Sequence, residues 1–282
     1  MYYGSDVIFI YDGTFEGFLS AVFDAYSLKI TPVNITTDKD IQESFDTEYH
    51  YVNTSDEKSD RVIAGMNKIG GGFTGNVTVA FFSWMPDREM VIYRYIVLGF
   101  EIKHKIFNKL DDDIVIRMSA MVSQVGREIN KLTGFLRFSV LENNLMYAEM
   151  SPKNNCLPFL LPHFSERMKV IPFLIHDLTY NQVGIYDTKE SYIRSSEGLT
   201  LPKYSADELQ YRRMWKCFYD TIAIEGRVNP KLRQQLMPKR YHKHIFEMQD
   251  HMFSGELDMA DSPDTIVQKQ ERGRDLLTDG NM

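Results

Sequence analysis

The sequence predicts an α+β fold in which a β-α opening leads to a helical middle, a small antiparallel sheet and C-terminal helices. Three observations carry this prediction. Apolar residues recur at helical spacing over most of residues 77–134. The period then changes to two over residues 136–150, which is typical of strands. Beyond residue 205 the spacing is helical again, and proline marks two helix starts.

The chain opens with a strand followed directly by a helix. Residues 7–11 are β-branched and aromatic, as in a buried strand, and apolar residues recur at helical spacing from Phe15. The Asp-Gly-Thr turn between them, residues 12–14, is expected to cap the helix, because no further glycine follows at phosphate-binding spacing. A second strand is expected over residues 48–53 and a helix over residues 56–69.

Two β-hairpins are predicted in the middle of the chain. Residues 136–140 alternate in polarity and precede an Asn-rich turn and a strand over residues 145–150. Residues 173–176 and 183–186 form the second hairpin pattern. A sheet of this size does not stand alone, so we expect one integrated domain over residues 1–252, with two lobes that meet near residue 134.

Helix signals also organise the C-terminal part of the chain. Ser205 and Glu208 have the spacing of a capping box. The apolar stripe expected behind this box consists of Leu209, Met214, Cys217, Phe218 and Ile222. Asn229 and Pro230 fit an N-cap followed by proline at the first helical position, and Pro238 repeats the signal. Residues 253–282 are predicted to form an acidic, mobile tail.

Composition excludes several classes of protein. With 43% hydrophobic residues in 282, the chain can bury a substantial core and is not wholly disordered. Its two cysteines, Cys156 and Cys217, form neither a disulfide framework nor a cysteine metal site. No secretory signal and no run of 18 apolar residues is visible, so we expect a cytoplasmic protein without a membrane contact.

A basic block stands out in this acidic chain. Residues 203–244 hold ten Lys and Arg against four Asp and Glu, a net charge of +6, whereas the whole chain carries −7. Helix starts and cations both favour anions, so the block suggests contact with the phosphate groups of a polyanion. The candidate residues are Arg227, Lys231, Arg233, Lys239, Arg240 and Lys243, with Arg127 and Lys131 as a second set on one helix face. A solvated helical face that pairs with the protein's own acids is the alternative.

One group of residues has acid-base potential. It consists of His163, Glu166, His176 and Asp177, from two segments that flank the second hairpin. A histidine beside a carboxylate can transfer protons near neutral pH. The alternative is a buried His-Asp pair that orders loops. No metal is expected, since His242 and His244 would point apart on a helix, and no cofactor motif is present.

Several motifs together carry a resemblance to a known family. They are IYDGTFEGFL (10–19), YRY (93–95), VGRE (125–128), PHF (162–164), IHD (175–177), NPKLR (229–233) and MPKRY (237–241). The sequence resembles a bacterial family of DNA metabolism or DNA repair proteins that is encoded beside a radical-SAM protein. The same domain occurs fused to uracil-DNA glycosylase domains. The resemblance covers roughly residues 7–248.

The resemblance implies an accessory DNA-repair protein that binds DNA through the basic block and acts with a radical-SAM or uracil-DNA glycosylase partner. The chain has no Cys-x3-Cys-x2-Cys motif, so it holds no radical-SAM cluster and needs no cofactor of its own. Two alternatives stay open: an enzyme that acts on a damaged base through the His/Asp group, and a protein that docks on a partner without touching DNA.

Overall fold

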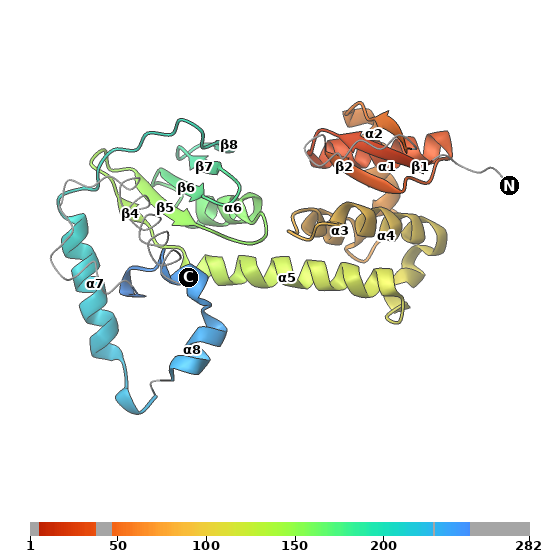
Figure 1. Cartoon of the computed structure of the whole chain (residues 1–282). Helices are drawn as coiled ribbons and strands as arrows, with labels where there is room; N and C mark the ends of the chain where they lie inside the picture. The colour runs from red at the N-terminus through yellow and green to blue at the C-terminus, as the bar shows by residue number, and fades with distance from the viewer. Residues whose placement is uncertain (1–5, 38–46, 228, 249–282) are drawn as a thin grey trace, which may run out of the picture. The chain divides into compact units, whose positions relative to one another are not determined.

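The computed structural model describes residues 6–37, 47–227 and 229–248 (Figure 1). The chain divides into two compact units, Met1–Arg127 and Glu128–Met282. The division falls inside one long helix, α5 (Asp113–Phe135), a few residues before the predicted lobe boundary. One integrated domain over residues 1–252 stays a prediction. The predicted acidic tail, residues 253–282, lies outside the described residues.

The first unit is built on a parallel sheet with the strand order β2-β1-β3. Its strands are β1 (Asp6–Tyr11), β2 (Asn34–Thr37) and β3 (Thr47–Tyr51). Besides the first part of α5, its helices are α1 (Phe15–Leu28), α2 (Asp56–Asn67), α3 (Phe73–Phe81), α4 (Arg88–Ile102) and the 3-10 helix η2 (Lys103–Asn108). The predicted β-α opening, second strand and following helix are confirmed, and β2 is an additional strand.

The turn between β1 and α1 is a capped helix start, as predicted. The Thr14 hydroxyl oxygen accepts a hydrogen bond of 2.9 Å from the Gly17 backbone N–H. The Asp12 carboxylate in turn accepts from the Thr14 backbone N–H at 2.9 Å. A Cβ atom on Gly17 would lie 2.1 Å from Asp12 Oδ1, so only glycine fits this close approach. The cap therefore uses the polar groups of the turn to begin the helix.

The second unit holds a five-stranded mixed sheet in the order β4-β5-β6-β7-β8. Its strands are β4 (Ser139–Val140), β5 (Met146–Met150), β6 (Phe173–Asp177), β7 (Gln182–Tyr186) and β8 (Ser191–Ser195). Both predicted hairpins are confirmed as antiparallel pairs, although β4 is shorter than expected. The sheet is not purely antiparallel, because β5 and β6 run parallel. Helix α6 (Leu157–Arg167) connects them and returns the chain to the same end of the sheet.

The core of the second unit joins residues from distant parts of the sequence. Leu132 from the end of α5, Leu160 from α6 and Phe173 from β6 belong to one buried cluster. Tyr241 and Ile245, from the predicted basic block and the residues just after it, complete the cluster and are almost fully buried. The block is therefore anchored in the core at its C-terminal end.

One long helix and several short ones follow the sheet. They are α7 (Glu208–Ile222), η3 (Glu225–Arg227), α8 (Pro230–Leu236), α9 (Lys239–His242) and η4 (Phe246–Met248). The predicted N-cap is confirmed, since the Asn229 side chain accepts a hydrogen bond of 3.0 Å from the Leu232 backbone N–H. None of the helices that the structure describes combines the length and apolar composition of a membrane span.

The predicted capping box at the start of α7 is wrong. The N-cap position is occupied by Asp207, and no side chain caps it. Glu208 turns instead into the protein, where its carboxylate accepts a hydrogen bond of 2.9 Å from the Val140 backbone N–H. The same carboxylate pairs with Arg212 at 2.7 Å, and both side chains are almost fully buried. Glu208 thus ties α7 to β4 rather than to its own helix start.

Candidate nucleic-acid interface

The predicted basic block divides into exposed cations and one cation with an internal partner. Arg227, Lys231, Arg233 and Lys239 are exposed, on or beside η3, α8 and α9. None of these four forms an ion pair with a carboxylate whose side chain the structure describes. Lys243 is half-buried. With respect to the described side chains, these four cations are therefore exposed and without a carboxylate partner.

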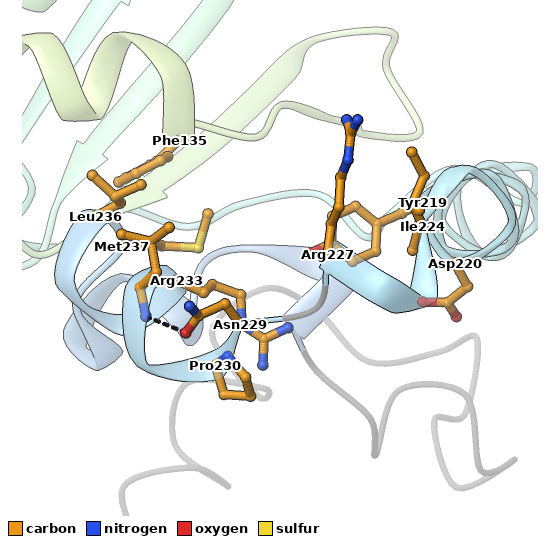
Figure 2. A pocket seen from close by; sticks show the side chains of 12 residues that line it. Phe135, Tyr219, Asp220, Ile224, Arg227, Asn229, Pro230, Arg233, Leu236 and Met237 are labelled. Atoms are coloured by element: carbon orange, nitrogen blue, oxygen red, sulfur yellow. Dashed lines mark hydrogen bonds between the residues drawn. The ribbon is translucent and has the colours of Figure 1, made fainter.

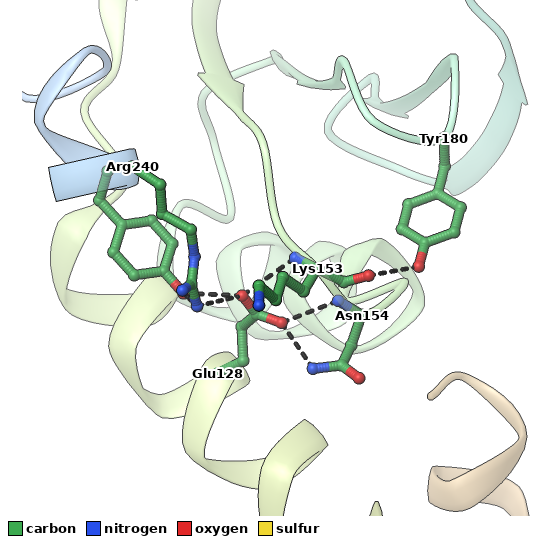
Figure 3. Close-up of polar contacts among 6 residues, drawn as sticks. Glu128, Lys153, Asn154, Tyr180 and Arg240 are labelled. Carbon is green, nitrogen blue, oxygen red and sulfur yellow. Dashed lines mark hydrogen bonds and ion pairs between the residues drawn. The ribbon is translucent and has the colours of Figure 1, made fainter. Parts of the chain in front are cut away.

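Arg240 has a different environment, because it contacts a buried carboxylate. Its guanidinium nitrogen donates to Glu128 Oε1 at 3.0 Å, and Glu128 is only 4% exposed. The Tyr241 hydroxyl donates to the same oxygen at 2.7 Å. We call Glu128 and its partners Lys153, Asn154, Arg240 and Tyr241 the Glu128 node (Figure 3).

The loop before α6 completes the Glu128 node. The backbone N–H of Lys153 donates a hydrogen bond to Glu128 Oε1 at 3.1 Å. Asn154 donates two to Glu128 Oε2, from its backbone N–H at 2.8 Å and from its side-chain amide at 2.6 Å. Burial alone would raise the pKa of Glu128, but the two backbone N–H groups and the Tyr241 hydroxyl outweigh it and hold the pKa below its usual range. Glu128 is therefore a buried, charged carboxylate that stabilises the second unit, and sequence reasoning missed it.

A cleft lies beside the exposed cations, between the end of α7 and α8 (Figure 2). It encloses about 590 Å³. The lining is mostly apolar and includes two arginines of the basic block; it consists of Phe135, Tyr219, Asp220, Ala223, Ile224, Arg227, Asn229, Pro230, Leu232, Arg233, Leu236 and Met237. We call this the α7–α8 cleft.

The apolar face of α7 that was expected to pack inward is exposed. Met214, Phe218 and Ile222 are each more than half exposed, and Cys217 is exposed as well. The Trp215 and Phe218 rings pair on this face with centroids 5.7 Å apart. The side chain of Leu209 lies outside the described residues. The prediction that this stripe packs into the core is therefore wrong. Met214, Cys217, Phe218 and Ile222 are not part of the described core of the second unit.

The second set of predicted cations lies on α5. Arg127 is exposed, and its Nε donates to the Ser123 backbone carbonyl at 3.1 Å along the same helix. Lys131 is half-buried. A role of either residue in DNA binding stays a prediction.

The four residues with acid-base potential occupy different surroundings. His163 and Glu166 are exposed on α6, where Glu166 pairs with Lys169 at 2.7 Å. His176 and Asp177 are neighbours in β6, so their side chains point to opposite faces of the sheet. The structure therefore gives no support to a His176–Asp177 pair. A catalytic role of these residues stays a prediction.

His176 takes part in a polar chain across the sheet. Its Nδ1 lies 2.8 Å from the Tyr147 hydroxyl, which donates to Glu149 at 3.0 Å. The other Glu149 oxygen lies 3.6 Å from His244, a residue at the end of the basic block. Burial lowers the pKa of His244 against the opposing charge of Glu149, so the imidazole is held towards its neutral form.

Asp177 is a buried carboxyl group with an unsatisfied oxygen. Its Oδ1 accepts from the backbone N–H groups of Thr179 and Tyr180, at 2.9 Å and 3.2 Å. Its Oδ2 is buried and has no hydrogen-bond partner. Burial raises the pKa of Asp177 to about 7, although the two backbone donors oppose the shift. The group therefore titrates near neutral pH inside the core.

The described residues include no group of three or more His, Cys, Asp or Glu side chains placed to hold a metal ion. A family model described as a domain of unknown function, DUF4130, matches residues 86–247, which is more than half of the chain. No curated protein matches the sequence.

Proposed function

The chain belongs to the DUF4130 family, and we propose that it is an accessory DNA-repair protein that binds DNA through the exposed cations of the basic block. Phosphate contacts supply most of the affinity of such proteins and require cations that are not already paired. Arg227, Lys231, Arg233 and Lys239 meet this requirement, whereas Arg240 is paired with Glu128. The single observation that carries the proposal is this group of four exposed cations, two of which, Arg227 and Arg233, line the α7–α8 cleft.

The partner of this protein would supply the chemistry. The resemblance of the sequence to proteins encoded beside a radical-SAM protein, or fused to uracil-DNA glycosylase domains, supports a partner of one of these two kinds. In this arrangement the protein holds DNA while the partner enzyme modifies or excises a base. The test for such a role begins with DNA binding itself.

DNA binding can be measured by fluorescence anisotropy of a labelled oligonucleotide across a salt series. The full chain should bind with a steep negative salt slope. The double variant Lys231→Ala/Arg233→Ala should bind all sequences more weakly and reduce the salt slope by about two, or roughly one for each lost phosphate contact.

Arg167 provides a matched control for this experiment. It is an exposed cation on α6, outside the basic block, so Arg167→Ala should leave affinity and slope unchanged. Wild-type protein that does not bind DNA at low salt would overturn the proposal. So would a double variant with the same affinity and slope as the wild type.

A docking role without DNA contact is the second candidate. The observation that favours it is the exposed apolar face of α7 around Trp215 and Phe218, because large exposed apolar patches mark interaction surfaces. Competition separates the two functions. If the partner enzyme and DNA share the basic block, DNA should displace the partner.

A further inference from the structure

The α7–α8 cleft combines features that phosphate binding alone does not need. It is concave and mostly apolar, and its volume of about 590 Å³ lies in the range of roughly 300–1,000 Å³ that is typical of sites for small organic groups. Apolar surface of this kind gains nothing from a phosphate. It is suited to a flat, poorly hydrated group that leaves water when it binds.

The charged side chains at the cleft indicate what else its ligand carries. Arg227 and Arg233 lie in its wall, and both side chains are exposed (Figure 2). The acidic side chain in the wall, Asp220, is paired with Lys216 at 3.1 Å, so its charge is offset. A ligand that carries negative charge beside an apolar ring matches this pattern.

We propose that the α7–α8 cleft binds an unpaired nucleobase of single-stranded DNA. The base lies against Tyr219 and the apolar wall, and Arg227 and Arg233 contact the flanking phosphates. Proteins that hold single strands combine an aromatic platform with a cationic groove in this way. In a duplex the base faces are already stacked, so the cleft favours single-stranded or locally opened DNA. This inference rests on the proposed function and adds the form of DNA that the site selects.

An experiment on the full chain can separate the contribution of the cleft to DNA binding from that of the charges around it. The probes are a labelled single strand of about 15 nucleotides and the duplex of the same sequence. Tyr219→Ala removes the platform, and Ala223→Trp fills the cleft from an exposed position without changing the net charge. Either change should weaken single-strand binding by roughly five- to a hundredfold and leave the salt slope unchanged.

Matched controls come from the sheet of the same unit. Tyr192 on β8 is an exposed tyrosine with the Arg194 guanidinium 5.4 Å from its ring centre, so it resembles the tyrosine and arginine of the cleft. Tyr192→Ala should bind both probes like the wild type. A 2-aminopurine base in the strand should change its fluorescence when wild-type protein binds, and not when Ala223→Trp binds. Unfolding curves confirm that each variant is folded.

The outcomes distinguish this inference from the proposed function. Equal affinity for strand and duplex, with no effect of Ala223→Trp, would overturn the base site and leave DNA binding intact. Absence of binding to either probe would overturn both. An acidic peptide of alternating Glu and Leu tests the other occupant. If it binds more tightly than the single strand and Ala223→Trp abolishes its binding, the cleft holds a protein segment and the inference is wrong.

Discussion

Arginine and tyrosine side chains meet in two regions of the second unit, with opposite results. At the Glu128 node, Arg240 and Tyr241 converge on one buried carboxylate. In the α7–α8 cleft, Arg227 and Tyr219 line a surface whose described residues include no buried acid. The first arrangement pairs its arginine inside the protein, and the second leaves its arginine exposed.

This difference shows that neighbouring cations in a basic block can do different work. Lys239 and Arg240 are adjacent in sequence, yet Lys239 is free of the acids that the structure describes and Arg240 is not. Arg240 should therefore matter mainly for folding, and Lys239 mainly for binding. A count of charges treats them alike.

The largest expected effect is the loss of the node's central carboxylate. Glu128→Ala leaves the donors from Asn154, Arg240 and Tyr241 without their buried acceptor. It should lower the free energy of unfolding by about 3–5 kcal/mol in urea titrations. Arg233→Ala, in the cleft, should change it by less than about 0.5 kcal/mol. Equal losses in the two variants would contradict the comparison.

Asp177 is a second buried carboxyl group, and it accepts fewer hydrogen bonds than Glu128 does. The two groups should therefore respond differently to pH. The raised pKa means that the folded protein keeps the Asp177 proton up to about pH 7, whereas the unfolded chain loses it near pH 4. This contribution to the free energy of unfolding is therefore full below about pH 4 and is lost as the pH rises to about 7, by on the order of 4 kcal/mol. Glu128 has the opposite sign, since its lowered pKa makes its contribution disappear as the pH falls.

Asp177→Asn isolates this titration. The amide oxygen keeps the position that accepts the Thr179 and Tyr180 backbone N–H groups, but it does not ionise. In urea titrations, the free energy of unfolding of the wild type should fall between about pH 4 and pH 7. The variant should not show this fall. A variant with the same pH profile as the wild type would exclude Asp177 as the source.

The smallest expected effect concerns the exposed face of α7. Phe218 is 51% exposed, so Phe218→Ser should change the free energy of unfolding by less than about 0.5 kcal/mol. Phe164, 5% exposed in the core of the same unit, is the matched control, and Phe164→Ala should cost about 3–5 kcal/mol. A large loss at Phe218 would mean that this face is covered in solution.

The sequence predicted the elements that rest on local signals. The strand and helix around the Asp-Gly-Thr turn, both hairpins and the Asn229 cap all depend on residues close together in the chain, and all are confirmed. The strands β2 and β8 were missed. β8 has only one partner, β7, and a polar, largely exposed sequence, so it lacks the apolar alternation that marks a half-buried strand.

The candidate site was harder to predict because it depends on distant partners. No local signal marks Glu128, because its partners Lys153, Asn154 and Tyr241 are distant in the sequence. Glu208 had the spacing of a cap, but a contact with Val140 overrides that local signal. Spacing gives the face of a helix and not what lies against it.

The Glu128 node also has a consequence for the order of events during synthesis. The carboxylate and the Tyr241 hydroxyl that binds it are 113 residues apart in the chain. At roughly 5–20 residues per second, the ribosome adds Tyr241 roughly 6–20 s after Glu128. The residues of the first unit are all made before this interval begins. During it, the nascent second unit carries an acid whose arginine and tyrosine do not yet exist.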